Sequence, residues 1–238
     1  MNLKQTAPEE FGRVTAFLYA VLAETSLRPF YQAAARQVTR HLNALHGRRN
    51  GVQVLDLGAG TAALARLMNR LPGAPPMVAL DASESMLAQA VRRSGPRPGP
   101  GMVLGRGEAL PFTDASLDLV LSSLSFHHWE DPAGILAEIH RILRPGGSLW
   151  TFEPDPNFPR PALRRGMRRF LGIWPPVWLL RRGFRRHGFS ASEYQTLVAP
   201  AVARSPFRGI ERVEPFLWLR WMVLTRAREP GDAGAPQG

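Results

Sequence analysis

The chain has 238 residues, and its 30 basic and 19 acidic side chains give a formal net charge of +11 at neutral pH. This length suits one large domain or two small ones, and a hydrophobic content of 45% excludes a wholly disordered chain. With no cysteine the chain has no disulfide framework and no thiolate metal site, so we expect a cytoplasmic protein.

Residues 1–50 are predicted to form N-terminal helices, because apolar side chains recur at helical spacing. Residues 51–155 then alternate short apolar runs with helical patterns, and this alternation predicts an α/β fold with helices on both faces of a parallel sheet. The carboxyl ends of parallel strands share one edge, so we expect the functional loops there. The predicted helices are Phe11–Ala23, Pro29–Leu45, Thr61–Leu71, Ser83–Arg93 and Pro132–Leu143, and the predicted strands are Val52–Leu57, Met77–Leu80, Met102–Leu104, Leu117–Ser122 and Ser148–Glu153.

The last third of the chain has a different pattern. Ser190-Ala-Ser-Glu193 is a capping box that predicts a helix to about Ala199. Ile210–Val213 and Phe216–Thr225 have strand composition, and their short connection through Pro215 predicts antiparallel pairing. We expect residues 1–228 to form one domain, with 51–155 as cofactor-binding core, 156–189 as an Arg-rich lid insertion, 190–228 as the C-terminal helix and strand pair, and 229–238 as a disordered tail.

A glycine-rich turn follows the first predicted strand, in the run Val54-Leu-Asp-Leu-Gly-Ala-Gly-Thr61. Such a turn lets a ligand approach the backbone, and Asp81 ends the next strand, where a carboxylate can accept hydrogen bonds from ribose hydroxyls. The pattern indicates an adenosine-containing cofactor. Asp56 would repel a pyrophosphate but attract an ammonium group, which favours S-adenosylmethionine over a dinucleotide.

Five ordered motifs of this sequence resemble those of class I S-adenosylmethionine-dependent methyltransferases, and most closely the small-molecule branch that includes quinone-biosynthesis methyltransferases. The resemblance implies a Rossmann-like, doubly wound seven-stranded sheet whose last strand is antiparallel. It covers roughly residues 30–155. The motifs are Asp56-Leu-Gly-Ala-Gly-Thr, Leu80-Asp-Ala-Ser-Glu-Ser-Met-Leu, Glu108-Ala-Leu-Pro-Phe112, Ser116-Leu-Asp-Leu-Val and Leu143-Arg-Pro-Gly-Gly147.

The same resemblance implies residues that hold the cofactor. Asp56 and the glycine turn would hold its methionine portion, Asp81 its ribose, and Ala82 and Met86 would flank the adenine. Family members often have an aspartate where this chain has Arg106, which cannot accept the hydrogen bond of the adenine amino group. The predicted cofactor-binding residues are Asp56, Gly58, Ala59, Gly60, Asp81, Ala82, Met86, Arg106, Gly107, Glu108 and Ser122.

The segment Ser122–Trp129 follows the fourth predicted strand and contains two adjacent histidines. Its first serine would lie near the sulfonium, and His127, or alternatively His128, would serve as a general base. The competing interpretation is that one histidine packs in the core and the other is solvated. We expect no metal site, because adjacent histidines should diverge and no cysteine is available. Glu153 and Asp155 either contact substrate or are ordinary loop carboxylates.

Methyl transfer is an in-line displacement that needs alignment rather than a charge-relay constellation. We therefore expect transfer to a small-molecule or lipid-like acceptor, in a pocket lined by Phe17 and Tyr19, or by Phe30 and Tyr31. Two other functions stay open: a catalytically silent or regulatory nucleotide-binding protein, and an NAD-dependent oxidoreductase. Thermal stabilisation by S-adenosylmethionine or by NAD would separate them.

The positive charge belongs to the C-terminal part of the chain. Residues 1–155 carry 15 basic and 14 acidic side chains, whereas residues 156–238 carry 15 and 5. Arginine pairs flank an apolar, Trp-bearing stretch within 160–186, which predicts contact with an anionic membrane surface. A solvated helix face is the alternative, and the core motifs disfavour nucleic acid. The arginines concerned are Arg160, Arg164, Arg165, Arg168, Arg169, Arg181, Arg182, Arg185 and Arg186.

Overall fold

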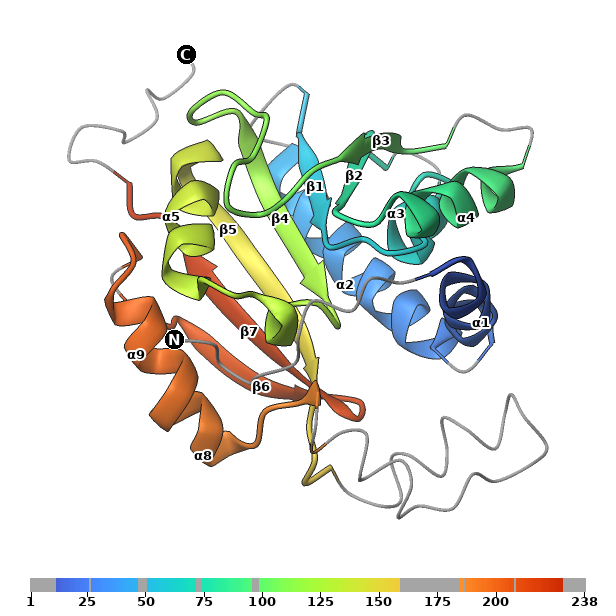
Figure 1. Ribbon diagram of the computed structural model, residues 1–238. Coiled ribbons are helices and arrows are strands. Elements are labelled where there is room, and N and C mark those ends of the chain that lie inside the picture. Colours follow the sequence, from blue (N-terminus) through green and yellow to red (C-terminus); the bar gives the residue numbers. More distant parts are fainter. Residues whose placement is uncertain are drawn as a thin grey trace.

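A computed structural model describes residues 12–25, 27–46, 51–71, 74–95, 99–158, 185, 187–207 and 209–228. Its centre is one seven-stranded sheet of order β3-β2-β1-β4-β5-β7-β6 (Figure 1). Neighbouring strands from β3 to β5 pair in parallel, and β7 is antiparallel to both β5 and β6. The predicted Rossmann-like sheet is confirmed. Its strands are β1 Val54–Leu57, β2 Met77–Asp81, β3 Gly101–Leu104, β4 Leu117–Ser123, β5 Leu143–Pro154, β6 Arg212–Phe216 and β7 Leu219–Thr225.

Helices cover both faces of the sheet (Figure 1). Because side chains alternate along a strand, Val54 of β1 packs with α2 and α3, whereas Leu55 packs on the opposite face with α5 and the segment 191–203. This doubly wound arrangement leaves the carboxyl ends of the parallel strands free for loops. The helical elements are α1 Arg13–Glu24, α2 Arg28–His46, α3 Ala63–Met68, α4 Glu84–Ser94, η1 Phe126–His128, α5 Pro132–Ile142, α8 Ala191–Glu193, η2 Tyr194–Val198 and α9 Ala199–Ala203.

Three boundaries differ from the expectation. Strand β5 starts at Leu143, so Arg144–Gly147, predicted as the loop that ends α5, belongs to the strand. Gly146 takes φ +80°, and a Cβ on Gly147 would lie 2.9 Å from a backbone oxygen, so both positions favour glycine. Pro215 lies inside β6 rather than between strands, which an edge strand tolerates. The helix opened at Ser190 includes the π-helical turn η2 and continues to Ala203.

The capping box at Ser190 is confirmed, since its side chain accepts from the Glu193 N–H and Glu193 accepts from the Ser190 N–H. The tail 229–238 and most of the predicted lid 156–189, including all its arginines except Arg185, lie outside the described residues. Within the described ranges, no helix combines the length and the apolar character needed to cross a lipid bilayer.

Three of the sequence motifs have structural roles. Glu138 of α5 accepts a hydrogen bond from Leu110 N at 2.9 Å, and Arg141 donates to Leu110 O at 3.0 Å and to Phe112 O at 2.8 Å. These contacts hold the motif Glu108–Phe112 against α5. In the next motifs, Asp118 forms an ion pair with Arg144 and accepts from Gln53 N at 2.9 Å. These contacts keep the functional loops at a constant distance from the sheet.

Candidate functional site

The turn after β1 requires glycine at two positions. Gly58 and Gly60 take φ +66° and +56°, and the N–H groups of Gly58 and Ala59 donate to Leu80 O at 2.8 and 3.0 Å. A Cβ on Gly58 would lie 1.9 Å from Ser125 Oγ, so no larger residue fits without displacing Ser125. The turn therefore joins the ends of β1 and β2 and presents bare backbone beside the segment after β4.

Asp81 connects this turn with the start of α4. Its Oδ2 accepts from Gly60 N at 2.7 Å and its Oδ1 accepts from Ser83 N at 2.8 Å. Burial raises the pKa of Asp81 above its ordinary value, and the two N–H donors partly oppose that rise. Each carboxylate oxygen keeps a second acceptor site, and Asp81 lines the neighbouring cavity. It can therefore accept two further hydrogen bonds from a ligand.

A cavity of about 650 Å³ opens at the carboxyl ends of β1, β2 and β4. It is large enough for a nucleoside-sized ligand. Ser125 and Trp129, from the predicted segment Ser122–Trp129, also line it, and so does Ile135, which the sequence did not indicate. Of the predicted cofactor residues, six line this cavity: Gly58, Asp81, Ala82, Arg106, Gly107 and Glu108. The other five are not among the lining residues: Asp56, Met86 and Ser122 are buried, and Ala59 and Gly60 are partly buried in the glycine turn.

Asp56 is buried beneath the glycine turn and is 1% exposed. Desolvation raises its pKa to about 7, and the nearby charge of Asp81 adds to the rise. Within the described part of the chain, its Oδ1 has no hydrogen-bond partner and no basic side chain pairs with it. An orphaned carboxylate oxygen next to a nucleoside-sized cavity fits a ligand that carries a positively charged group, as S-adenosylmethionine does.

The serines after β4 divide between core and cavity. Ser122 is fully buried, whereas Ser125 lines the cavity beside Gly58. Ser123 instead belongs to a hydrogen-bonded chain with Tyr31 and Tyr19, and desolvation raises the pKa of Tyr19 to about 12. Tyr19 lies 3.6 Å from the position of a Cβ on Gly60, so α1 contacts the glycine turn directly.

The residues predicted for an acceptor pocket have mixed surroundings. Phe30 is fully buried, and its ring centroid lies 5.6 Å from that of Phe152 in the core. Tyr31 is 5% exposed, whereas Phe17 is 51% exposed on α1. Among the four, only Tyr19 is both partly accessible and next to the glycine turn. The structure therefore favours the pair on α1 over the pair on α2.

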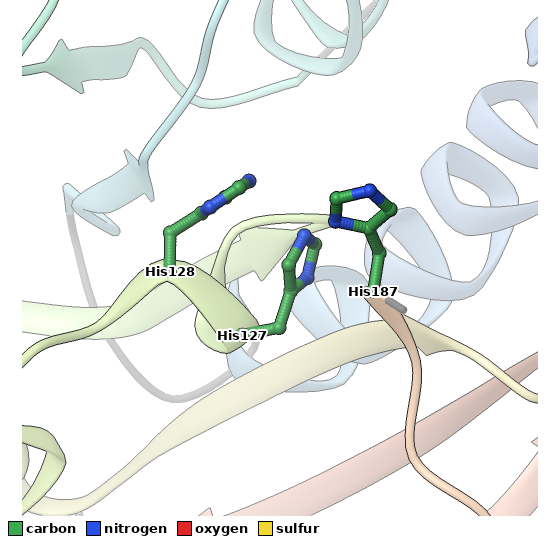
Figure 2. Close-up of side chains that lie close together, drawn as sticks. All are labelled: His127, His128 and His187. Carbon is green, nitrogen blue, oxygen red and sulfur yellow. The ribbon is translucent and has the colours of Figure 1, made fainter. Parts of the chain in front are cut away.

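His127 and His128 lie together, contrary to the expectation that adjacent histidines diverge. The short helix η1 sets their ring centroids 4.1 Å apart, and His187, which was not predicted as a site residue, lies 5.1 Å from His127 (Figure 2). Burial lowers the pKa of His128 to about 3, and the neighbouring His127 and His187 lower it further in the same direction. The expectation of no metal site assumed that the two histidine rings point apart, and the structure contradicts that assumption.

Glu153 and Asp155 are positioning groups rather than exposed loop carboxylates. The fully buried Glu153 accepts from His127 Nδ1 at 2.5 Å and from the N–H groups of Ser125 and Phe126 at 2.9 and 2.8 Å. Asp155 forms an ion pair with Arg220 at 2.9 Å. Glu153 thus orients His127 and fixes the segment that carries Ser125.

Comparison with known proteins shows that the central part of the chain is similar to methyltransferase domains. Residues 55–151 match the family model described as "Methyltransferase domain". This match confirms the predicted family resemblance and supports the predicted cofactor, S-adenosylmethionine.

Two relatives and one solved structure extend this finding. The chain is 35% identical over 113 residues to a demethylmenaquinone methyltransferase of Chlorobaculum tepidum. The aligned segment covers 48% of this chain and 44% of that protein. It is 38% identical over 97 residues to a malonyl-[acyl-carrier protein] O-methyltransferase of Methylococcus capsulatus, covering 41% and 35%. The match thus spans less than half of each relative. A putative S-adenosylmethionine-dependent methyltransferase of Methanococcus maripaludis shares the fold, with a TM-score of 0.73, 20% identity and coverage of 94% and 98%.

Proposed function

We propose that this chain transfers a methyl group from S-adenosylmethionine to a small-molecule acceptor by in-line displacement. The observation that carries the proposal is the pair of carboxylates at the carboxyl edge of the sheet: Asp56 is buried beside the cavity, and the partly buried Asp81 lines it. Neither has a cationic partner among the described residues, and S-adenosylmethionine bears an ammonium and a sulfonium.

The predicted cofactor-binding residues divide between the two ends of the cofactor. Asp81 would accept hydrogen bonds from the ribose hydroxyls, and Ala82 and Gly107 would contact the adenine. Asp56, Gly58 and Gly60 would hold the methionine portion. The Arg106 side chain is 62% exposed, and its Nε lies 3.7 Å from Glu108 Oε2. Its guanidinium can stack on the adenine base, but it cannot accept a hydrogen bond from the adenine amino group.

The bound cofactor supplies a methyl group that is already activated by its sulfonium. The protein has to align the acceptor, exclude water and, for an acceptor that carries a proton, remove that proton. We assign the last task to His127. Because Glu153 accepts from Nδ1–H, the lone pair of this imidazole is on Nε2, where it can take a proton.

An NAD-dependent oxidoreductase is the second candidate, and Asp56 argues against it. A carboxylate buried under the glycine turn would repel a pyrophosphate at that place. A silent or regulatory relative would bind the cofactor without turnover. The acceptor class draws support from the quinone and acyl-carrier relatives, and from the exposed apolar residues Val14, Phe17 and Leu18 on α1.

A methyl-transfer assay tests the proposal. The protein is incubated with S-adenosylmethionine labelled on its methyl group and with fractionated extract or prenylated and polar phenols. Label in an acceptor is the expected result, together with its loss in Asp81→Ala. Binding of the cofactor without transfer to any fraction would favour the silent relative.

The predicted membrane contact of residues 160–186 remains a proposal. Co-sedimentation with anionic and neutral liposomes tests it, since arginine pairs should bind anionic headgroups more strongly. Equal binding to both kinds of liposome would contradict an electrostatic contact.

A further inference from the structure

Three of the six histidines of the chain meet at the end of β4. The ligand nitrogens of His127, His128 and His187 all lie within 4.8 Å of one another, and Figure 2 shows the three rings gathered around a common space. His127 and His128 come from η1, whereas His187 comes from the segment that precedes α8. Residues 60 positions apart in the chain thus converge on one point.

We propose that His127, His128 and His187 bind a divalent transition-metal ion, with Zn²⁺, Co²⁺ and Ni²⁺ as the preferred class. Imidazole nitrogens suit these ions, and three histidines with a fourth open position form a known type of catalytic zinc site. Zn–N bonds of about 2.1 Å in tetrahedral geometry place ligand nitrogens about 3.4 Å apart. The ligand nitrogens lie within 4.8 Å of one another, so binding requires them to approach by up to about 1.4 Å.

Glu153 gives the cluster the outer-shell partner that metal-binding histidines usually have. It accepts from His127 Nδ1 at 2.5 Å and is itself held by the N–H groups of Ser125 and Phe126. This fixes the tautomer in which Nε2 of His127 carries the lone pair, which is the atom a metal needs. Glu153 also places a buried negative charge one imidazole away from the ion.

Aromatic packing and hydrogen bonds connect the backbone segments on the two sides of the cluster. Phe126 and Phe189 are fully buried, and their ring centroids lie 5.8 Å apart. Phe189 N also donates to Pro154 O at 2.9 Å, and the capping box of α8 begins at the next residue. The neighbours of His127 and His187 therefore pack against each other, so the three imidazoles are held together before any ion binds.

The site is separate from the proposed function, because an ion can bind whether or not methyl transfer occurs. The metal site and the proposed methyl transfer both use one atom, Nε2 of His127. Nε2 of His127 cannot hold a metal and accept a proton at the same time, so bound metal excludes His127 from acting as a base. The open coordination position would then take a water or an acceptor oxygen.

Titration of the tag-free chain with Zn²⁺, followed by calorimetry, tests the site. We expect one ion per chain, with a metal-dependent rise in melting temperature. His128→Ala and His187→Ala should each weaken binding by more than about 100-fold, beyond the range found for outer-shell partners. His140→Ala is the matched control. His140 lies in α5 and packs against Phe207, so its substitution should leave metal binding unchanged.

Two further measurements keep the test independent of folding defects. Co²⁺ should give the visible absorption of a tetrahedral site, which His187→Ala abolishes. Glu153→Gln should weaken metal binding about 10- to 100-fold, because an amide that donates to Nδ1 leaves Nε2 protonated. Far-UV circular dichroism and the urea unfolding midpoint serve as the folding readouts in each variant, because His128 lines the proposed cofactor cavity. No Zn²⁺ binding by the wild-type chain, or undiminished binding in the double variant of His128 and His187, would overturn the proposal.

Discussion

Key carboxylates at the two edges of the parallel sheet differ in their partners. At the amino edge and along α5, Asp118 pairs with Arg144, and Glu138 and Asp114 pair with Arg141. At the carboxyl edge, Asp56 and Asp81 have no basic partner within the described ranges and interact only with backbone or with each other. Burying a charge without a partner destabilises a fold, so unpaired acids are typical of functional sites.

The difference assigns the acids of the two edges to different tasks. The paired acids of the amino edge hold the loops in place, while Asp56 and Asp81 of the carboxyl edge keep negative charge available for a cationic ligand, although Asp155 and Glu108 near that edge have arginine partners. Substitutions at the carboxyl edge should therefore change cofactor affinity, and equivalent substitutions at the amino edge should change stability.

Asp81→Ala tests the carboxyl edge with the largest expected effect. Hydrogen bonds to a charged group contribute about 1.5–3 kcal/mol each, so loss of two should weaken S-adenosylmethionine binding by about 100-fold or more. Calorimetry measures this. Asp114→Ala, at a residue that is 77% exposed, is the matched control and should change affinity by less than about threefold. Equal effects of the two variants would contradict the comparison.

Asp118→Ala tests the amino edge. It leaves the partly buried guanidinium of Arg144 and the N–H of Gln53 without their acceptor. We expect the free energy of unfolding to fall by about 2–3 kcal/mol, with the loss reduced by the solvent exposure of Arg144. Urea denaturation measures it. Cofactor affinity of the folded variant should stay within about threefold of wild type, and a larger loss would mean that the two edges are not independent.

Asp56→Asn tests the raised pKa. In the free protein the neutral form of Asp56 is favoured, so its contribution to stability is lost as the pH rises from its ordinary pKa of 3.8 through about 7. The cofactor ammonium favours the ionised form, so affinity should increase by up to tenfold per pH unit between about pH 5.5 and 7. The Asn variant should lack this dependence. An unchanged slope in the variant would exclude Asp56 as its source.

Arg106→Asp is expected to have the smallest effect. The substitution restores an acceptor for the adenine amino group at the position where the family resemblance implies an aspartate. One added hydrogen bond contributes about 0.5–1.5 kcal/mol, so affinity should rise by about 2- to 10-fold. A loss of affinity would instead show that Arg106 itself contacts the cofactor.

The sheet and its cofactor edge could be predicted because their signals are local. A short apolar run followed by a glycine turn, and an acid at the end of the next run, place Asp56 and Asp81 on neighbouring strands. Boundaries were less certain where tertiary pairing overrides local preference. The residues Arg144–Gly147 predict the end of a helix, but they belong to β5, which pairs with β4 and β7.

The histidine cluster could not be predicted, because it depends on contacts between distant segments. Nothing near His187 in the sequence indicates that it lies against η1; the packing of Phe189 on Phe126 brings it there. Adjacent histidines were expected to diverge, whereas the 3₁₀ turn η1 sets the rings of His127 and His128 side by side. Strand β4 continues to Ser123, one residue beyond its predicted end. The cavity is therefore lined by Ser125, in the loop after the strand, rather than by Ser122.

Calorimetric titration of the wild-type chain with S-adenosylmethionine and with NAD tests the central claim, that the unpaired acids of the carboxyl edge hold a cationic methyl donor. We predict one S-adenosylmethionine per chain, with a proton released from Asp56 on binding below about pH 7, and no measurable binding of NAD. Binding of NAD without binding of S-adenosylmethionine would contradict it.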